Sequence, residues 1–298
     1  YRVGPGCGPF PLSYDRPAMR LEILIADAGE RLRSIGIHNG PQEARWMLRH
    51  VLGAGSSRLA GGPAAGLTPA AVAAFEALLQ RRLAGEPLQY VLGSAEFYGL
   101  ELSVGPGVLV PRPETERLVD FALEHCVPGA GLCDVCTGSG AIALALAHER
   151  PDLGEVVGTD LSPTALGYAR RNAERLGLAV QFLEGDLFGP LPPGRRFGVI
   201  TANPPYIDPV SYEALAGEVR DHEPRLALWA DDGGLAVVSR VAREGFGRLR
   251  PGGVLLCEIS AEQGAAAAAL FRSAGFVSVE VRQDYAGRDR VVVARRVV

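Results

Sequence analysis

From Leu132 onward, apolar and polar positions follow two patterns in turn. Short apolar runs, typical of buried strands, are separated by longer segments with the apolar spacing of amphipathic helices. The short runs predict strands at 132–136, 155–159, 179–183, 197–202, 253–259, 276–282 and 290–296. The longer segments predict helices at 141–149, 163–176, 235–249 and 261–274. Strands that alternate with helices predict an α/β fold with a mostly parallel, doubly wound sheet.

The last two predicted strands are separated only by the turn at 284–289. A parallel connection needs a crossover of a dozen or more residues, so these two strands must be antiparallel. Seven strands that end in an antiparallel hairpin are the arrangement of a class I (Rossmann-like) methyltransferase sheet.

The first part of the chain has a helical pattern instead. Helices are predicted from Pro17 to about Gly36, at 41–52 and from Thr68 to Leu83. At 97–102 apolar residues recur at every second position, which predicts a β-hairpin within 88–110. Another helix is expected at 115–125. The expected parts are therefore a flexible tail (1–18), a small all-helical domain (19–87), a β-hairpin linker (88–110) and the α/β domain (111–298). The helical domain is mildly basic, which fits either a solvated surface or a docking module for a partner.

Composition excludes some classes of function. A net charge of −4 and a pI near 5.8 argue against strong non-specific binding of nucleic acid. The chain contains no lysine, which excludes Schiff-base and lysine-base chemistry. No apolar run approaches the ~20 residues of a membrane span, and the Gly- and Pro-rich start does not resemble a signal peptide. Five scattered cysteines suggest a reducing compartment, so we expect a cytoplasmic protein.

Cys133 and Cys136 have C-x-x-C spacing, so redox and zinc functions have to be weighed. Residues three apart on a strand point to opposite faces, and no second Cys or His pair follows at zinc spacing. We expect structural thiols and no metal site.

The loop after the first strand of the α/β domain is rich in glycine, and acidic residues follow the next two strands. Glycines let the backbone approach a ligand, and a helix N-terminus favours an anionic group. Asp160 can hold both hydroxyls of a ribose, and Asp186 can accept from an adenine amino group while Leu187 covers the ring. The expected cofactor-binding residues are Asp134, Cys136, Thr137, Gly138, Ser139, Gly140, Asp160, Leu161, Asp186, Leu187 and Asn203.

Two cofactors fit this pattern. Residues 138–143 match the G-x-G-x-x-A fingerprint of dinucleotide-binding enzymes, so an NAD enzyme is a real competitor. The seven-strand ending, Asp186 and the motif at 203–206 favour S-adenosyl-L-methionine instead.

That motif, Asn-Pro-Pro-Tyr at 203–206, follows a buried strand directly. Open α/β sheets place their chemistry at the C-terminal ends of strands. Prolines donate no N–H group, so the carbonyl oxygens of this turn keep acceptor capacity. The Asn203 side-chain oxygen and the Pro204 backbone oxygen could hold the two hydrogens of one NH2 group, with Tyr206 as a flat face beside it. The motif therefore predicts a cradle for a planar amine or amide nitrogen.

Several segments together resemble one family, the protein-(glutamine-N5) methyltransferases of the HemK/PrmC type, which modify peptide-chain release factors. The similarity covers roughly 21–293. It is carried by residues 89–93 and 95–99, P-R-P-E-T-E at 111–116, the loop at 137–143, N-P-P-Y-I at 203–207, E-V-R-D-H-E-P-R at 218–225 and A-G-R-D-R at 286–290. The chain departs from the family at Cys136 and Ser260, where glycine is usual.

The resemblance implies an enzyme that methylates the glutamine of the Gly-Gly-Gln loop in class I release factors, with helical N-terminal residues that help to dock the factor. It implies catalytic roles for Asn203, Pro204 and Tyr206. The expected substrate-binding residues are Asn203, Pro204, Pro205, Tyr206, Arg112, Glu114 and Phe97. The N-P-P-Y motif is shared with adenine methyltransferases, so a nucleic-acid amine methyltransferase remains an alternative. A non-catalytic binding protein with a cofactor fold is a second alternative.

Overall fold

The computed structural model describes residues 21–53 and 67–297. The expected tail at 1–18, the start of the first predicted helix and Cys7 lie outside these ranges. Backbone contacts divide the chain into two compact units, Tyr1–Leu88 and Gln89–Val298, and each is described by itself.

The described part of the first unit consists of helices α1 (Leu21–Ser34), α2 (Gly40–Leu52) and α3 (Pro69–Leu83). Helix α1 packs on α2 and α3 through buried side chains that include Leu32, Met47 and Phe75. Arg82 on α3 and Glu43 on α2 form a buried ion pair, with 2.7 Å between Arg82 Nε and Glu43 Oε2. An ion pair buried in this way fixes how the two helices meet, because either partner alone would be a costly buried charge.

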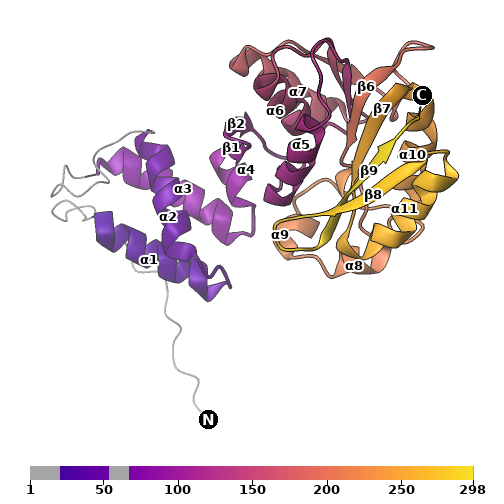
Figure 1. Cartoon of the computed structure of the whole chain (residues 1–298). Helices are drawn as coiled ribbons and strands as arrows, with labels where there is room; N and C mark the ends of the chain where they lie inside the picture. The colour runs from indigo at the N-terminus through magenta and orange to yellow at the C-terminus, as the bar shows by residue number, and fades with distance from the viewer. Residues whose placement is uncertain (1–20, 54–66, 298) are drawn as a thin grey trace. The chain divides into compact units, whose positions relative to one another are not determined.

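The second unit is built on a seven-stranded sheet in the order β5-β4-β3-β6-β7-β9-β8 (Figure 1). Its strands are β3 (Leu132–Val135), β4 (Val156–Asp160), β5 (Val180–Glu184), β6 (Phe197–Ala202), β7 (Leu249–Glu258), β8 (Ser278–Gln283) and β9 (Asp289–Arg295). Strands β3 to β7 pair in parallel, whereas β9 is antiparallel to both β7 and β8. The predicted α/β fold with its antiparallel ending is confirmed.

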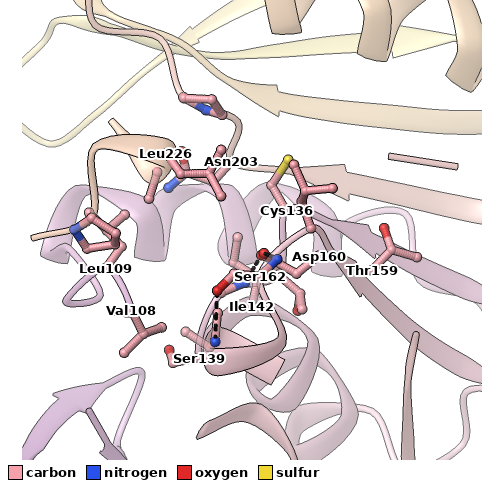
Figure 2. A pocket seen from close by; sticks show the side chains of 18 of the residues that line it. Val108, Leu109, Cys136, Ser139, Ile142, Thr159, Asp160, Ser162, Asn203 and Leu226 are labelled. Atoms are coloured by element: carbon pink, nitrogen blue, oxygen red, sulfur yellow. Dashed lines mark hydrogen bonds between the residues drawn. The ribbon is translucent and has the colours of Figure 1, made fainter. Parts of the chain in front are cut away.

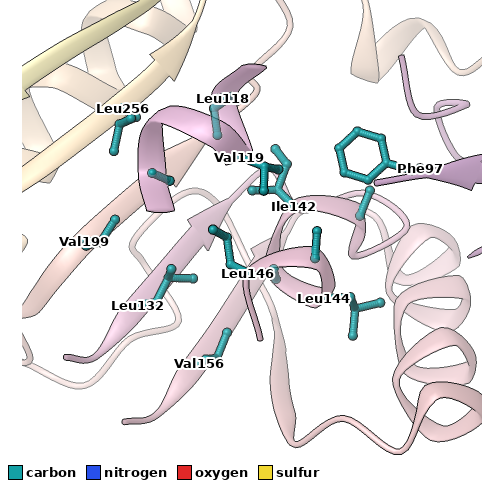
Figure 3. Close-up of a cluster of buried hydrophobic side chains, with 14 of the residues drawn as sticks. Phe97, Leu118, Val119, Leu132, Ile142, Leu144, Leu146, Val156, Val199 and Leu256 are labelled. Carbon is teal, nitrogen blue, oxygen red and sulfur yellow. The ribbon is translucent and has the colours of Figure 1, made fainter. Parts of the chain in front are cut away.

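Helices cover both faces of this sheet (Figure 1). The regular helices after the first strand pair are α5 (Glu116–Leu123), α6 (Ala141–Glu149), α7 (Pro163–Leu176), α8 (Pro209–Glu213), α9 (Gly217–Arg220), α10 (Ala236–Arg248) and α11 (Gly264–Ser273), with 3-10 turns η2 (Pro113–Thr115), η3 (Arg225–Ala227) and η4 (Ala261–Gln263). Successive strand residues enter different core clusters, as the two-residue period of a strand requires. Leu132 and Val199 join the cluster that contains residues of α5, α6 and α7 (Figure 3), whereas Cys133 and Ile200 join the cluster with α10 and α11.

The segment 88–110 differs from the expected hairpin. It begins with a short helix, α4 (Leu88–Leu92), and the hairpin is limited to β1 (Ser94–Phe97) and β2 (Leu100–Ser103). Leu88, Val91 and Leu92 have helical spacing, which overrides the two-residue period at this end. Beyond β2 the chain approaches α7 closely, since a Cβ on Gly105 would lie 2.4 Å from Tyr168 Oη.

The strand order reverses between β3 and β6, because β4 lies on one side of β3 and β6 on the other. Ligands of open α/β sheets bind at such switch points, beyond the carboxyl ends of the strands. The loops that follow β3, β4, β5 and β6 are therefore the place to look for a site. In the described ranges no helix is both long and apolar enough to cross a membrane.

Candidate active site

A cavity of about 270 Å³ lies at this edge of the sheet (Figure 2). Its walls come from the loops after β3, β4, β5 and β6, from the starts of α6 and α7, from α10, and from two segments, 107–115 and 224–227. Of the residues predicted to bind cofactor or substrate, the cavity brings together Cys136, Thr137, Gly138, Ser139, Asp160, Leu161, Asp186, Leu187, Asn203, Pro205 and Arg112. Asp134, Gly140, Pro204, Tyr206, Glu114 and Phe97 do not line it.

Asp134 is fully buried beneath the glycine loop. Thr137 Oγ1 donates to its Oδ2 at 2.6 Å, and Thr201 Oγ1 donates to its Oδ1 at 2.8 Å. Burial raises the pKa of Asp134 to about 7, although these hydroxyls and the Ala143 N–H lower it. The carboxylate therefore ties the loop to β6 instead of facing a ligand.

The glycine loop has a left-handed backbone at several positions. Gly138 (φ 58°) lines the cavity, and Gly140 (φ 82°) is the N-cap of α6. A Cβ on Gly140 would lie 3.0 Å from Leu144 Cδ1 and 3.1 Å from Phe182, so packing as well as φ requires glycine there. Cys136 also has a positive φ of 58°, which is costly for a residue with a Cβ.

Asp160 ends β4 and faces the cavity (Figure 2). Its Oδ2 accepts from the Gly138 N–H at 2.8 Å, and its Oδ1 accepts from the Ser162 N–H at 2.8 Å. Burial raises the pKa of Asp160, and these backbone N–H groups lower it. Each carboxylate oxygen has a second lone pair, so the fixed carboxylate can accept from a pair of neighbouring hydroxyl groups.

Asp186 is held by a cation that the sequence did not reveal. Arg240 on α10 forms a two-pronged ion pair with it, with NH1–Oδ1 at 3.1 Å and NH2–Oδ2 at 2.9 Å. Both residues line the cavity, and Leu187 beside them is buried with a left-handed backbone (φ 46°). An amino group of a ligand would therefore have to share Asp186 with Arg240 or displace it.

The turn at 203–206 contains two oxygens that accept no hydrogen bond from the described residues. Asn203 Nδ2 donates to Thr115 Oγ1 at 3.2 Å, which turns Asn203 Oδ1 away from Thr115. Within the described ranges, no residue donates a hydrogen bond to Asn203 Oδ1 or to the Pro204 carbonyl oxygen. Two neighbouring acceptor oxygens without a protein partner, one of them on a residue of the cavity wall, suit a group with two N–H bonds.

Tyr206 does not line the cavity, so it does not provide the expected flat face there. Its hydroxyl donates to Glu258 Oε1 at 3.0 Å, and its backbone oxygen accepts from Gln263 Nε2 at 3.0 Å. Its carbonyl also packs so closely on Gly234 that a Cβ there would lie 2.0 Å from the oxygen. These contacts fix the backbone of the turn.

The three other residues predicted to bind the substrate lie in different places. Arg112 lines the cavity, and its NH2 donates at 2.6 Å to Glu223, which also accepts from the Val110 N–H. Glu114 is exposed on η2 outside the cavity. Phe97 is 1% exposed within the core cluster of α5 and α6, because its side of β1 faces that core.

Sequence reasoning missed Thr115, Glu223 and Glu258. Glu223 joins the segment 218–225 to the segment 111–116, and Thr115 contacts Asn203 from 88 positions earlier in the chain. Glu258 had a signal that could have found it, since it ends a strand at the same edge of the sheet as Asp160. The C-x-x-C residues Cys133, which is buried, and Cys136, which is half-buried, are free thiols.

The sheet order and the site at its switch point define a methyltransferase fold. A structure titled as a methyltransferase from Pyrococcus furiosus is similar over 67% of this chain and 90% of its own, with a TM-score of 0.52 and 20% identity. The Thermus thermophilus 16S rRNA N2 G1207 methyltransferase is similar over 68% of this chain and 49% of its own, with a TM-score of 0.51 and 22% identity. At these identities the likeness shows the fold alone.

Sequence relatives define the family within this class. Residues 24–93 match the PrmC N-terminal domain model, and 132–222 match a methyltransferase domain model. The release factor glutamine methyltransferase of Vibrio cholerae is 41% identical over 93% of this chain and 97% of its own length. That of Bordetella pertussis is 44% identical over 84% and 92%. The chain belongs to the family of release factor glutamine methyltransferases, which confirms the resemblance inferred from its motifs.

Proposed function

We propose that this enzyme transfers a methyl group from S-adenosyl-L-methionine to the side-chain amide nitrogen of the glutamine in the Gly-Gly-Gln loop of class I peptide-chain release factors. Two kinds of observation support this. The relatives of this chain are release factor glutamine methyltransferases over nearly its full length. The single structural observation that carries the proposal is the pair of acceptors at Asn203 Oδ1 and the Pro204 carbonyl, which match the two N–H bonds of a primary amide.

The cavity fits the proposed methyl donor. Asp160 offers two fixed acceptor oxygens for the ribose hydroxyls, and Gly138 lets the backbone approach the amino-acid end. Leu187 and Leu161 provide apolar contact, and Asp186 would accept from the adenine amino group by sharing its oxygens with Arg240 or by releasing Arg240. When bound, this cofactor supplies an electrophilic methyl group on a sulfonium, whose transfer leaves S-adenosylhomocysteine and frees one proton from the amide nitrogen.

The cradle acts on the amide by orientation. An amide nitrogen is a weak nucleophile because its lone pair is delocalised, so placing it correctly carries much of the catalysis. Asn203 and Pro204 fix the plane of the NH2 group by accepting from both of its N–H bonds. As methyl transfer proceeds, positive charge grows on the nitrogen, and the two aimed oxygens stabilise it. The freed proton can pass to water, since neither oxygen is a strong base.

The same two acceptors would suit the amino group of an adenine, which is the main alternative. The relatives argue against it, because they are named for glutamine methylation. The net charge of −4 also argues against a nucleic-acid substrate, whose binding relies on a basic surface.

The test is methyl transfer to a purified class I release factor, followed by mass mapping of the modified residue. We expect one methyl group on the glutamine of the Gly-Gly-Gln loop. A factor in which this glutamine is changed to Glu has no NH2 group and should accept no methyl. A factor with Asn there keeps the amide but is one methylene shorter, so it should react very slowly. A methyl group on a carboxylate, or on adenine when nucleic acid is supplied, would refute the proposal.

A further inference from the structure

Three charged side chains form a connected group at the wall of the cavity. Asp186 lies in the loop after β5, and Arg240 and Glu244 lie one turn apart on α10. Arg240 NH1 donates to Asp186 Oδ1 at 3.1 Å, and its NH2 donates to Asp186 Oδ2 at 2.9 Å. Arg240 Nε donates to Glu244 Oε1 at 3.1 Å. Asp186 and Arg240 line the cavity, whereas Glu244 does not.

Helix α10 is a firm support for Arg240. Val241, the next residue, is fully buried in the core between this helix and the sheet. At Gly245 the contact is so close that a Cβ would lie 2.3 Å from Leu255 Cδ1 on β7. Glu244 holds the guanidinium from the same helix, at the i, i+4 spacing at which helix side chains meet. The position of Arg240 is therefore set by the helix and not by the loop that it contacts.

Asp186 depends on Arg240 for the orientation of its side chain. It lies in a loop, and its side chain is 55% exposed. Within residues 21–53 and 67–297, Arg240 is the only hydrogen-bond partner of this carboxylate. A carboxylate on a loop without a partner turns freely in water, and a ligand that binds it must remove that freedom at a cost in affinity. The two-pronged contact with Arg240 removes this freedom in advance.

The contact also leaves acceptor capacity on Asp186. An ionised carboxylate has about four lone-pair sites on its two oxygens. Arg240 occupies one site on each oxygen, so each oxygen can accept a further N–H group. The positive charge of Arg240 is shared between two carboxylates, so the group of three keeps a net negative charge. Such a group still attracts a neutral N–H donor, for example the amino group of a base.

We infer that Arg240 is a positioning residue of the proposed methyl-donor site: it fixes Asp186 so that this carboxylate accepts from the adenine amino group, and it stays in place when the donor binds. Arg240 thereby increases the selection of adenine over a base without an amino group. The inference rests on the proposed function, since it assigns the base of S-adenosyl-L-methionine to this wall of the cavity. If Arg240 instead had to leave Asp186 for the donor to bind, removing Arg240 would strengthen binding.

The experiment measures the binding of two ligands by calorimetry. One is S-adenosylhomocysteine, and the other is its analogue with hydrogen in place of the adenine amino group. In the unaltered protein the missing amino group should weaken binding about tenfold, the scale for a hydrogen bond to a charged group. In Arg240→Met, S-adenosylhomocysteine should bind about fivefold more weakly, the scale for ordering one side chain on binding. The analogue should bind equally to both proteins, because it does not donate to Asp186.

Two controls separate positioning from a general effect on the fold. Arg243→Met removes an exposed arginine of the same helix that does not line the cavity, and it should leave both affinities unchanged. In an Asp186→Ala background the two ligands should bind alike, and Arg240→Met should have no further effect. A loss in Arg240→Met that is the same for both ligands, or that persists without Asp186, would overturn the inference. Equal or tighter binding of S-adenosylhomocysteine by Arg240→Met would overturn it as well.

The binding measurements contain no release factor, so they test Arg240 apart from the methyl acceptor. If the loss in Arg240→Met depends on the amino group while no glutamine is methylated, the proposed acceptor is wrong and the role of Arg240 stands. If glutamine is methylated while Arg240→Met binds both ligands like the unaltered protein, the role of Arg240 is wrong and the proposed function stands. If the unaltered protein binds neither ligand, both are wrong.

Discussion

The buried carboxylate of Glu258 should make the stability of this protein depend on pH. Burial raises its pKa from 4.5 to about 7, so between these values the unfolded chain loses a proton that the folded protein retains. The folded state then binds more protons than the unfolded state, and stability must fall as pH rises. The contribution of Glu258 is fully present below pH 4.5 and is lost by about pH 7.

The size of the effect follows from the same two values. A pKa change from 4.5 to about 7, at about 1.36 kcal/mol for each pH unit, corresponds to as much as about 3 kcal/mol. Glu258→Gln removes this titration but adds buried N–H groups, whose cost does not depend on pH. The informative quantity is therefore the difference in free energy of unfolding between the variant and the unaltered protein, followed across pH. We expect it to move in favour of the variant by about 3 kcal/mol between pH 4.5 and pH 7.5.

Urea unfolding followed by tryptophan fluorescence can measure this difference. The chain has two tryptophans, Trp46 in the first unit and Trp229 in the second. A Trp46→Phe background leaves Trp229 as the reporter of the unit that contains Glu258. If the free energies of unfolding of the two proteins run parallel across this pH range, Glu258 is not a buried group with a raised pKa, and the reasoning fails.

Four other altered proteins test separate parts of the enzyme. Asp160→Ala should weaken binding of S-adenosyl-L-methionine tenfold or more, since a charge-assisted hydrogen bond contributes ~1.5–3 kcal/mol, and unchanged affinity by calorimetry would remove Asp160 from the site. Cys136→Gly should change the free energy of unfolding by less than about 1 kcal/mol, whereas Cys136→Val should lower it by about 2 kcal/mol or more, because φ is 58° at this position. Equal urea midpoints of the two variants would contradict this. The segment 89–298, once shown to fold, should bind the methyl donor normally but methylate an intact release factor at least tenfold more slowly, and an equal rate would rule out docking by the first unit.

Local pattern was enough to predict most of the α/β unit. Strand β6 and helix α7 have the predicted bounds, 197–202 and 163–176, because their apolar spacing and flanking caps agree. Strand β7 begins at Leu249, earlier than predicted, since it continues through Pro251 and two glycines by shifting its register against β6. A Pro-Gly-Gly stretch signals a turn locally, and only the pairing with a neighbouring strand overrides that signal.

For the site, the rule that chemistry follows strand ends led to Asp160 and Asn203, which line the cavity, but not to their partners. Thr115 is joined to Asn203 across 88 positions, a distance that no local pattern spans. Phe97 was expected in the pocket but lies in the core. The alternation of residues along a strand shows which side chains share a face, but it does not show which of the two faces a distant helix will cover. Asp186 was identified without its partner Arg240, which comes from a helix 54 positions later.

The most direct test of the cradle is single-turnover methyl transfer by Asn203→Ala. The change removes one of the two acceptors for the glutamine NH2 group and leaves the contacts of Asp160 with Gly138 and Ser162 in place. We expect the rate to fall by ~10²–10³, the scale for losing one positioned hydrogen-bond partner of the transition state, with little change in affinity for S-adenosyl-L-methionine. The loss should appear in kcat, because the contact strengthens as charge develops on the nitrogen. Near-normal turnover by Asn203→Ala on the glutamine of the release factor would contradict the account.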